Sequence, residues 1–221
     1  MARERADRLL PANNRSRVDV QAGVESPGSG HPRFSAFLVA VVVGFAFGGV
    51  DQYLGSLRLL VVFGEWPSTV SQMSAPWLVL PFAFGLTQVS SGRAMRLGLV
   101  ATQSALAGYF VLTLSPLEGV SPGSFPSSLV SLVASGQNWM YIVAGAVTGT
   151  LYGLLGQRWR VDRSWISVAL VTGALCLEPV ARQAVGRLSP PTVVWTAEVA
   201  MGAALALVYV IATVTHHRTN S

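Results

Sequence analysis

The chain has 221 residues, of which 51% are hydrophobic and only 11% are charged. Soluble domains usually carry roughly a quarter charged residues, so this composition excludes an ordinary soluble domain and predicts a membrane protein. The net charge is +5, and all 15 basic residues are arginines. These arginines lie beside apolar runs. Membrane topology and contact with anionic lipid headgroups therefore explain the positive charge better than binding to nucleic acid does.

The N-terminal segment, residues 1–33, is polar and arginine-rich and shows no sustained helical or strand period. We predict a disordered basic tail on the cytoplasmic side. A basic region before an apolar run is also typical of a cleaved signal peptide. No small-residue cleavage motif precedes Asp51, however, so we expect an uncleaved first helix.

The apolar runs of the rest of the chain predict an all-α bundle of six transmembrane helices, each with the ~20 residues that a span needs. The predicted spans are 34–50, 70–89, 97–114, 139–155, 164–185 and 192–214. Residues 34–214 then form one membrane domain, and 215–221 a short cytoplasmic tail. Residues 127–134, in the longest loop, predict a short amphipathic helix at the membrane surface.

Small residues recur at every fourth position in two of these spans. The first span carries the series Ala36, Ala40, Gly44 and Gly48, and the fourth carries Gly145, Gly149 and Gly153. Such smooth faces let helix backbones approach closely in lipid. They predict tight packing within the bundle, and they equally permit self-association or contact with other membrane subunits.

The distribution of arginine predicts the orientation. Twelve of the 15 arginines lie in the N-terminal tail, in the two short turns after the second and fourth spans, and at the C-terminus. The other three, Arg58, Arg182 and Arg187, lie in the opposite loops or close to them. Positive-inside bias therefore predicts cytoplasmic termini and a multi-pass protein of the cell membrane, which in bacteria is the inner membrane.

Four charged residues are candidates for a solute-binding site: Glu178, Glu198, Asp51 and Arg182. At ~1.5 Å per residue, Glu178 lies roughly 20 Å along the fifth span from Trp165, and all four share the outer half of the bundle. Ionisable groups at membrane depth are costly and often functional. One interpretation is an outward-facing polar pocket for a cationic or hydrogen-bonding solute. The other is structural: Arg182 pairs with Glu178 at helical spacing, and Glu198 is bonded to another helix or protonated.

The usual catalytic constellations are missing from the spans. His31, His216 and His217 all lie in the tails, and Cys176 is the single cysteine. The spans therefore offer no histidine for haem, metal or a serine triad, and there is no second intramembrane aspartate and no Walker-type loop. We expect no enzyme activity, no cofactor and no metal.

Several short motifs carry a resemblance to a known family. They are SAPW at 74–77, YGLLGQRWR at 152–160, Glu178, and Glu198 followed by Gly202. Over about residues 35–213 the chain resembles the small six-helix integral membrane proteins of actinobacteria that share a domain of unknown function. This resemblance implies six helices and no particular activity.

A looser, architectural likeness is to the substrate-binding subunits of energy-coupling-factor vitamin transporters. Those six-helix proteins dock their transmembrane partner through an alanine-spaced motif, a spacing that Ala36 and Ala40 share. Architecture alone is weak evidence for function. From the residues we expect a small-solute binding or transport component. The alternative is a non-transporting scaffold or accessory subunit, in which the buried charges are structural.

Overall fold

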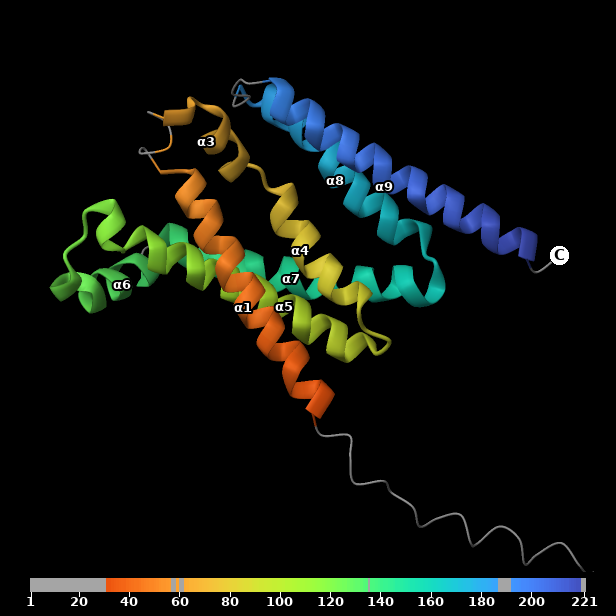
Figure 1. Ribbon diagram of the computed structural model, residues 1–221, viewed down its shortest axis with the longest axis horizontal. Coiled ribbons are helices and arrows are strands. Elements are labelled where there is room, and N and C mark those ends of the chain that lie inside the picture. Colours follow the sequence, from red (N-terminus) through yellow and green to blue (C-terminus); the bar gives the residue numbers. More distant parts are fainter. Residues whose placement is uncertain (1–30, 57–58, 60–61, 135, 187–191, 220–221) are drawn as a thin grey trace, which may run out of the picture. The chain divides into compact units, whose positions relative to one another are not determined.

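The computed structural model describes residues 31–56, 59, 62–134, 136–186 and 192–219, and these residues form helices and turns without a strand. The predicted tail, 1–33, lies outside the described residues except for 31–33, which begin the first helix. The helices are α1 (His31–Leu54), α3 (Trp66–Ser71), α4 (Ala75–Leu86), α5 (Ser91–Thr113), α6 (Phe125–Ala134), α7 (Gly136–Asp162), α8 (Trp165–Ala184) and α9 (Thr192–Thr219), with 3-10 turns at Pro116–Glu118 and Pro122–Ser124. Figure 1 shows them coloured along the sequence.

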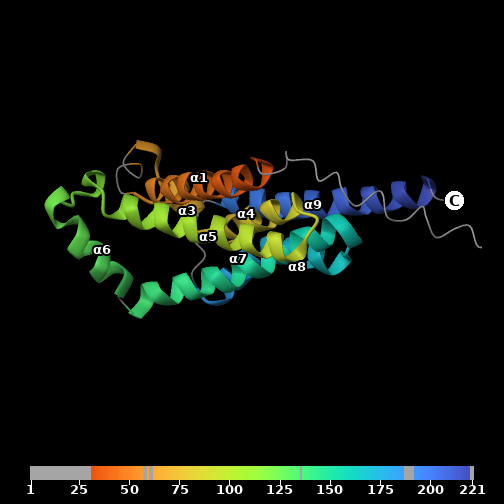
Figure 2. The ribbon, with the colours of Figure 1, turned by 90° about the horizontal axis from the view of Figure 1, so that it is seen from below.

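Five of the described helices, α1, α5, α7, α8 and α9, are long and apolar enough to cross a membrane. Several run past the predicted spans, and α9 continues to Thr219 through the segment predicted as a tail. The short helix predicted at 127–134 is present as α6, which connects the ends of α5 and α7 (Figure 2).

The predicted second span, 70–89, is not one continuous helix. It consists of the end of α3, a break at residues 72–74, and α4, which has only 12 residues. Pro76 explains the break, because a proline ring clashes with the carbonyl four residues earlier in a helix, which here is that of Gln72. Pro76 is instead accommodated in the first turn of α4, where its missing N–H costs nothing.

The predicted glycine faces are confirmed as close-packing surfaces. A Cβ at Gly44 or Gly48 of α1 would overlap the backbone carbonyl of Ala101 or Ala105 on α5. On α7, Gly153 lies against Ala94 and Gly98 of α5, while its own carbonyl lies against Gly85 of α4. Only a residue without a side chain permits this separation, so α4, α5 and α7 meet backbone to backbone at one point.

The α8–α9 hairpin packs on this group of helices through side chains. A buried cluster joins it to α4 and α7 and consists of Ala75, Phe82, Leu155, Val171 and Leu175. Within the hairpin, which runs antiparallel in Figure 1, Gly202 of α9 lies against Leu175 and Cys176 of α8. The hydroxyl of Tyr209 closes the α7–α8 turn by donating to the carbonyl of Arg163, at 3.1 Å.

The C-terminal end of α4 is capped by α7. Arg160 donates from Nη1 to the carbonyl oxygens of Leu86 and Thr87, at 3.3 and 2.7 Å. One turn earlier, Gln157 donates to the carbonyl of Val89 and accepts from Ser91, both at 3.0 Å. A cation at the C-terminus of a helix satisfies free carbonyls and complements the helix dipole. These side chains fix the turn between α4 and α5.

We expect Arg160→Ala to lower the free energy of unfolding by about 1 kcal/mol, the usual net contribution of an intramolecular hydrogen bond. The matched control is Arg158→Ala, since Arg158 is exposed two residues earlier on the same helix and no hydrogen bond of its side chain is recorded among the described residues. Thermal unfolding of the purified variants in detergent measures the difference. Equal loss in both variants would show that net charge, and not the cap, is responsible.

Candidate functional site

The N-terminus of α4 is capped by a residue that lies 104 positions away in the sequence. Glu178 of α8 accepts hydrogen bonds from the amide of Ser74, at 2.7 Å to Oε1 and 3.0 Å to Oε2, and from the amide of Ala75, at 2.9 Å. The first amides of a helix have no partner within it, and the Ser74 side chain makes no capping bond. The carboxylate therefore supplies the cap and also places negative charge at the positive end of the helix dipole.

Arg182 lies one turn further along α8 and binds both Glu178 and the break between α3 and α4. Its Nε and Nη2 atoms lie 2.8 and 2.7 Å from Oε1 of Glu178. Nη2 also donates to the carbonyl of Gln72 and lies 3.5 Å from the hydroxyl of Ser74. The guanidinium carbon is 5.4 Å from the ring centroid of Trp195. The predicted pair at helical spacing is thus present, and it holds the broken segment in place.

Glu198, the second predicted intramembrane carboxylate, is buried behind this arrangement. It is 1% exposed, and neither carboxylate oxygen has a hydrogen-bond partner among the described residues. The charged groups that act on it are Glu178 and Arg182. A buried carboxylate is costly as an ion unless it is paired, and Glu198 lies next to the ion pair of Glu178 and Arg182.

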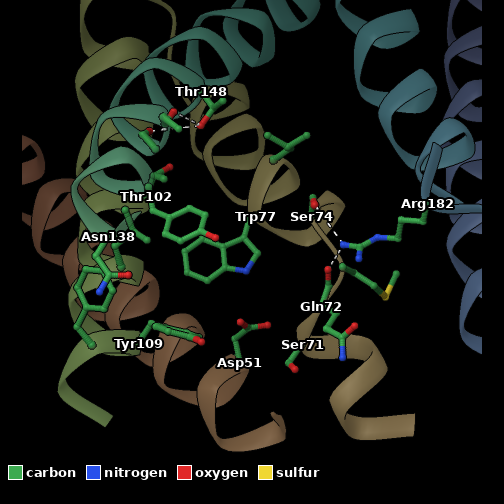
Figure 3. A pocket seen from close by; sticks show the side chains of 17 residues that line it. Asp51, Ser71, Gln72, Ser74, Trp77, Thr102, Tyr109, Asn138, Thr148 and Arg182 are labelled. Atoms are coloured by element: carbon green, nitrogen blue, oxygen red, sulfur yellow. Dashed lines mark hydrogen bonds between the residues drawn. The ribbon is translucent and has the colours of Figure 1, made fainter. Parts of the chain in front are cut away.

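A pocket of about 680 Å³ opens on the other side of the break. Residues of α1, α3, α4, α5, α7 and α8 and of the break contribute to its wall. Figure 3 shows their side chains. The lining residues are Asp51 of α1, residues 71–74, Trp77 and Leu78 of α4, Thr102, Leu106, Tyr109 and Phe110 of α5, Asn138, Tyr141, Ala144, Gly145 and Thr148 of α7, and Arg182 of α8.

Asp51 is the acidic residue of this pocket. It lies in the last turn of α1 and is only 7% exposed. The indole N–H of Trp77 faces its carboxylate, and the hydroxyl end of Tyr109 points toward it (Figure 3). Trp77 is fixed by edge-to-face contacts with Phe47 and Tyr109, at centroid distances of 5.4 and 6.3 Å. The carboxylate is therefore held among aromatic rings from α4 and α5.

The four predicted site residues occupy three different positions. Asp51 and Arg182 line the pocket, Glu178 lies behind Arg182 and caps α4, and Glu198 lies deeper still. Among the described residues, no three histidine, cysteine, aspartate or glutamate side chains gather as a metal site would require. The arrangement is suited to binding a solute by charge, hydrogen bonds and aromatic contact.

Sequence reasoning identified Asp51 and Arg182 but missed the threonine and tyrosine residues that α5 and α7 contribute to the wall. Thr102, Leu106 and Tyr109 are spaced by four and three residues, and so lie along one face of α5. The same holds for Tyr141, Ala144 or Gly145, and Thr148 on α7. Threonine and tyrosine at helical spacing within apolar runs are the signal that could have identified these walls.

Comparison with protein-family models, with curated protein sequences and with solved structures finds no match to this chain. The resemblance to the actinobacterial six-helix proteins and the likeness to vitamin-transporter subunits therefore stay predictions. The site has to be interpreted from its own geometry.

Proposed function

We propose that the chain is an integral membrane protein of the bacterial inner membrane that binds or transports a small solute in the pocket beside the α3–α4 break. In this proposal Trp66–Leu86 acts as the second of six spans, since α3, the break and α4 together reach the ~20 residues that a span needs. Both termini then lie in the cytoplasm.

Exposed apolar side chains support the membrane part of the proposal. On α1 they include Leu38, Val42 and Phe45, and on α9 Leu207 and Ile211. A soluble monomer rarely exposes large contiguous apolar surfaces. Helices that present such residues outward, and pack through glycine inward, are arranged as they would be in lipid.

The break between α3 and α4 is the observation that carries the solute-binding part. Irregular backbone at membrane depth is tolerated where it is buried in protein or lines a cavity, and broken helices form the solute sites of many transporters. Here residues 71–74 line the pocket, and Glu178 and Arg182 satisfy the backbone groups that the break frees. The solute would be bound and released without chemical change.

The rival is a scaffold or accessory subunit of a membrane complex, in which the charges hold helices together. The roles of Glu178 and Arg182 favour this interpretation for those two residues, because each is satisfied by protein groups. It gives no reason for the pocket or for a buried aspartate within it. We therefore retain it as the second candidate, with other membrane subunits as the expected partners.

Native mass spectrometry of the gently purified full chain separates the two candidates. We expect a non-lipid small molecule to accompany the wild type and to be lost from Thr148→Trp, which fills the pocket. Leu151→Trp, at an exposed position one turn further along α7, is the matched control and should retain it. If no small molecule is recovered from the wild type and other membrane subunits are recovered instead, the solute-binding proposal is wrong.

A further inference from the structure

The charge balance of the pocket favours a cation as its occupant. Asp51 and Arg182 are the lining residues with a formal charge, but the charge of Arg182 is neutralised by Glu178, with 2.7 Å between the paired atoms. No ion pair of Asp51 is recorded among the described residues. The pocket wall therefore offers one acidic group without a counter-charge, Asp51. A cation bound beside it would favour the ionised carboxylate and so give the site a negative potential.

The position of Asp51 in its helix strengthens this negative potential. It lies in the last turn of α1, which ends at Leu54. The C-terminus of a helix carries a partial negative charge, and a carboxylate there is unfavourable unless a cation is nearby. Burial to 7% exposure removes most of the water that would otherwise screen it. A bound positive charge would relieve both costs.

The other walls are suited to an organic cation and unsuited to a hard metal ion. Protein sites for calcium and magnesium usually combine carboxylates with other oxygen ligands. Among the described residues of the lining, Asp51 is the one carboxylate, and no cluster of acidic side chains is present. Much of the remaining wall is aromatic or aliphatic, and Trp77 and Tyr109 lie beside Asp51. Aromatic side chains next to a carboxylate suit an alkylammonium ion, because its nitrogen pairs with the carboxylate while its apolar substituents contact the rings.

On these grounds we infer that the pocket binds a small alkylammonium ion, with its nitrogen at Asp51 and its alkyl substituents against Trp77 and Tyr109. The hydroxyl groups of Thr102 and Thr148 lie further along the wall (Figure 3) and would contact a polar group at the other end of the ligand. This inference rests on the proposed function and names the class of solute that the same pocket takes.

The test measures binding to the purified full chain by titration calorimetry with two probes of equal shape. Choline carries the cation, and 3,3-dimethylbutan-1-ol is its neutral isostere. We expect choline to bind the wild type at least tenfold more tightly than the alcohol. Asp51→Asn should weaken choline at least tenfold and leave the alcohol unchanged. Glu118→Gln removes an exposed carboxylate outside the pocket and should change neither affinity.

Two results would overturn the inference. One is equal affinity for both probes, with no effect of Asp51→Asn; the other is no choline binding to a wild type that is folded and monodisperse. Neither result decides the proposed function, because the native mass spectrometry described above detects a solute of any charge. A neutral or anionic molecule that is recovered there and lost in Thr148→Trp would keep the proposed function and reject the cation.

Discussion

Replacing Glu178 by alanine should lower the free energy of unfolding by about 3 kcal/mol, since loss of a helix cap costs about 1 kcal/mol and loss of hydrogen bonds to a charged group about 2 kcal/mol. The substitution leaves the amides of Ser74 and Ala75 without a cap and the guanidinium of Arg182 without its carboxylate. It therefore releases the N-terminus of α4 and the broken segment that follows α3. Thermal unfolding and folded yield in detergent measure the loss.

Glu198→Gln is the matched control, because it changes the other buried carboxylate of the same hairpin. Its oxygens have no hydrogen-bond partner among the described residues, so a neutral side chain of the same shape should leave stability unchanged or raise it slightly. If Glu198→Gln lowers the free energy of unfolding as much as Glu178→Ala does, the two carboxylates act as one unit and the capping explanation is wrong. If Glu178→Ala is tolerated, the break is held by other contacts.

The structural and functional interpretations of the charged residues are therefore compatible. Glu178 and Arg182 stabilise the wall of the pocket, since they bind the backbone at Gln72 and Ser74, which belong to that wall. Asp51 faces the pocket itself. A variant at Glu178 would consequently impair solute binding through the fold, whereas Asp51→Asn changes the charge that the ligand meets and leaves the cap intact.

The helices and their packing faces were predictable because each depends on residues that lie close together in the sequence. Apolar length predicts α5, α7, α8 and α9, and glycine at every fourth residue predicts the faces of α1 and α7. The break at residues 72–74 was not predictable in the same way. A proline such as Pro76 indicates a kink or the start of a helix equally well. The unpaired backbone groups at the break are bound by Glu178 and Arg182, which lie more than 100 residues away in the sequence.

The candidate site was predictable only where a residue is unusual in itself. Charge at membrane depth identifies Asp51 and Arg182 as residues of interest. Tyr109, Thr102 and Thr148 are ordinary residues in apolar helices, and their convergence depends on the rotation of α5 and α7 about their axes. That rotation is set by the contact of Gly98 with Gly149 and Gly153. The sequence of one helix does not show which face of a neighbouring helix it packs against.

The point at which α4, α5 and α7 meet gives the last prediction. Gly153→Ala should lower the free energy of unfolding by about 2 kcal/mol or more, as overpacking of a tight contact does. The added Cβ would lie 2.5 Å from the carbonyl oxygen of Ala94 and 3.2 Å from the Cα of Gly98. Both atoms belong to backbone, which cannot turn aside as a side chain can, so α5 and α7 would have to separate.

The same substitution at Gly173 of α8 provides the control, and there the expected change in stability has the opposite sign. Nothing lies within 4 Å of a Cβ at that position, and alanine favours a helix over glycine by up to about 1 kcal/mol. Gly173→Ala should therefore be at least as stable as the wild type when both variants are unfolded in the same detergent. Equal loss at both positions would mean that the glycines act through backbone flexibility. Loss of stability at Gly153 alone would show that the close contact of α5 and α7 requires a residue without a side chain at this position. The same contact sets the positions of Thr102 and Thr148 in the pocket wall.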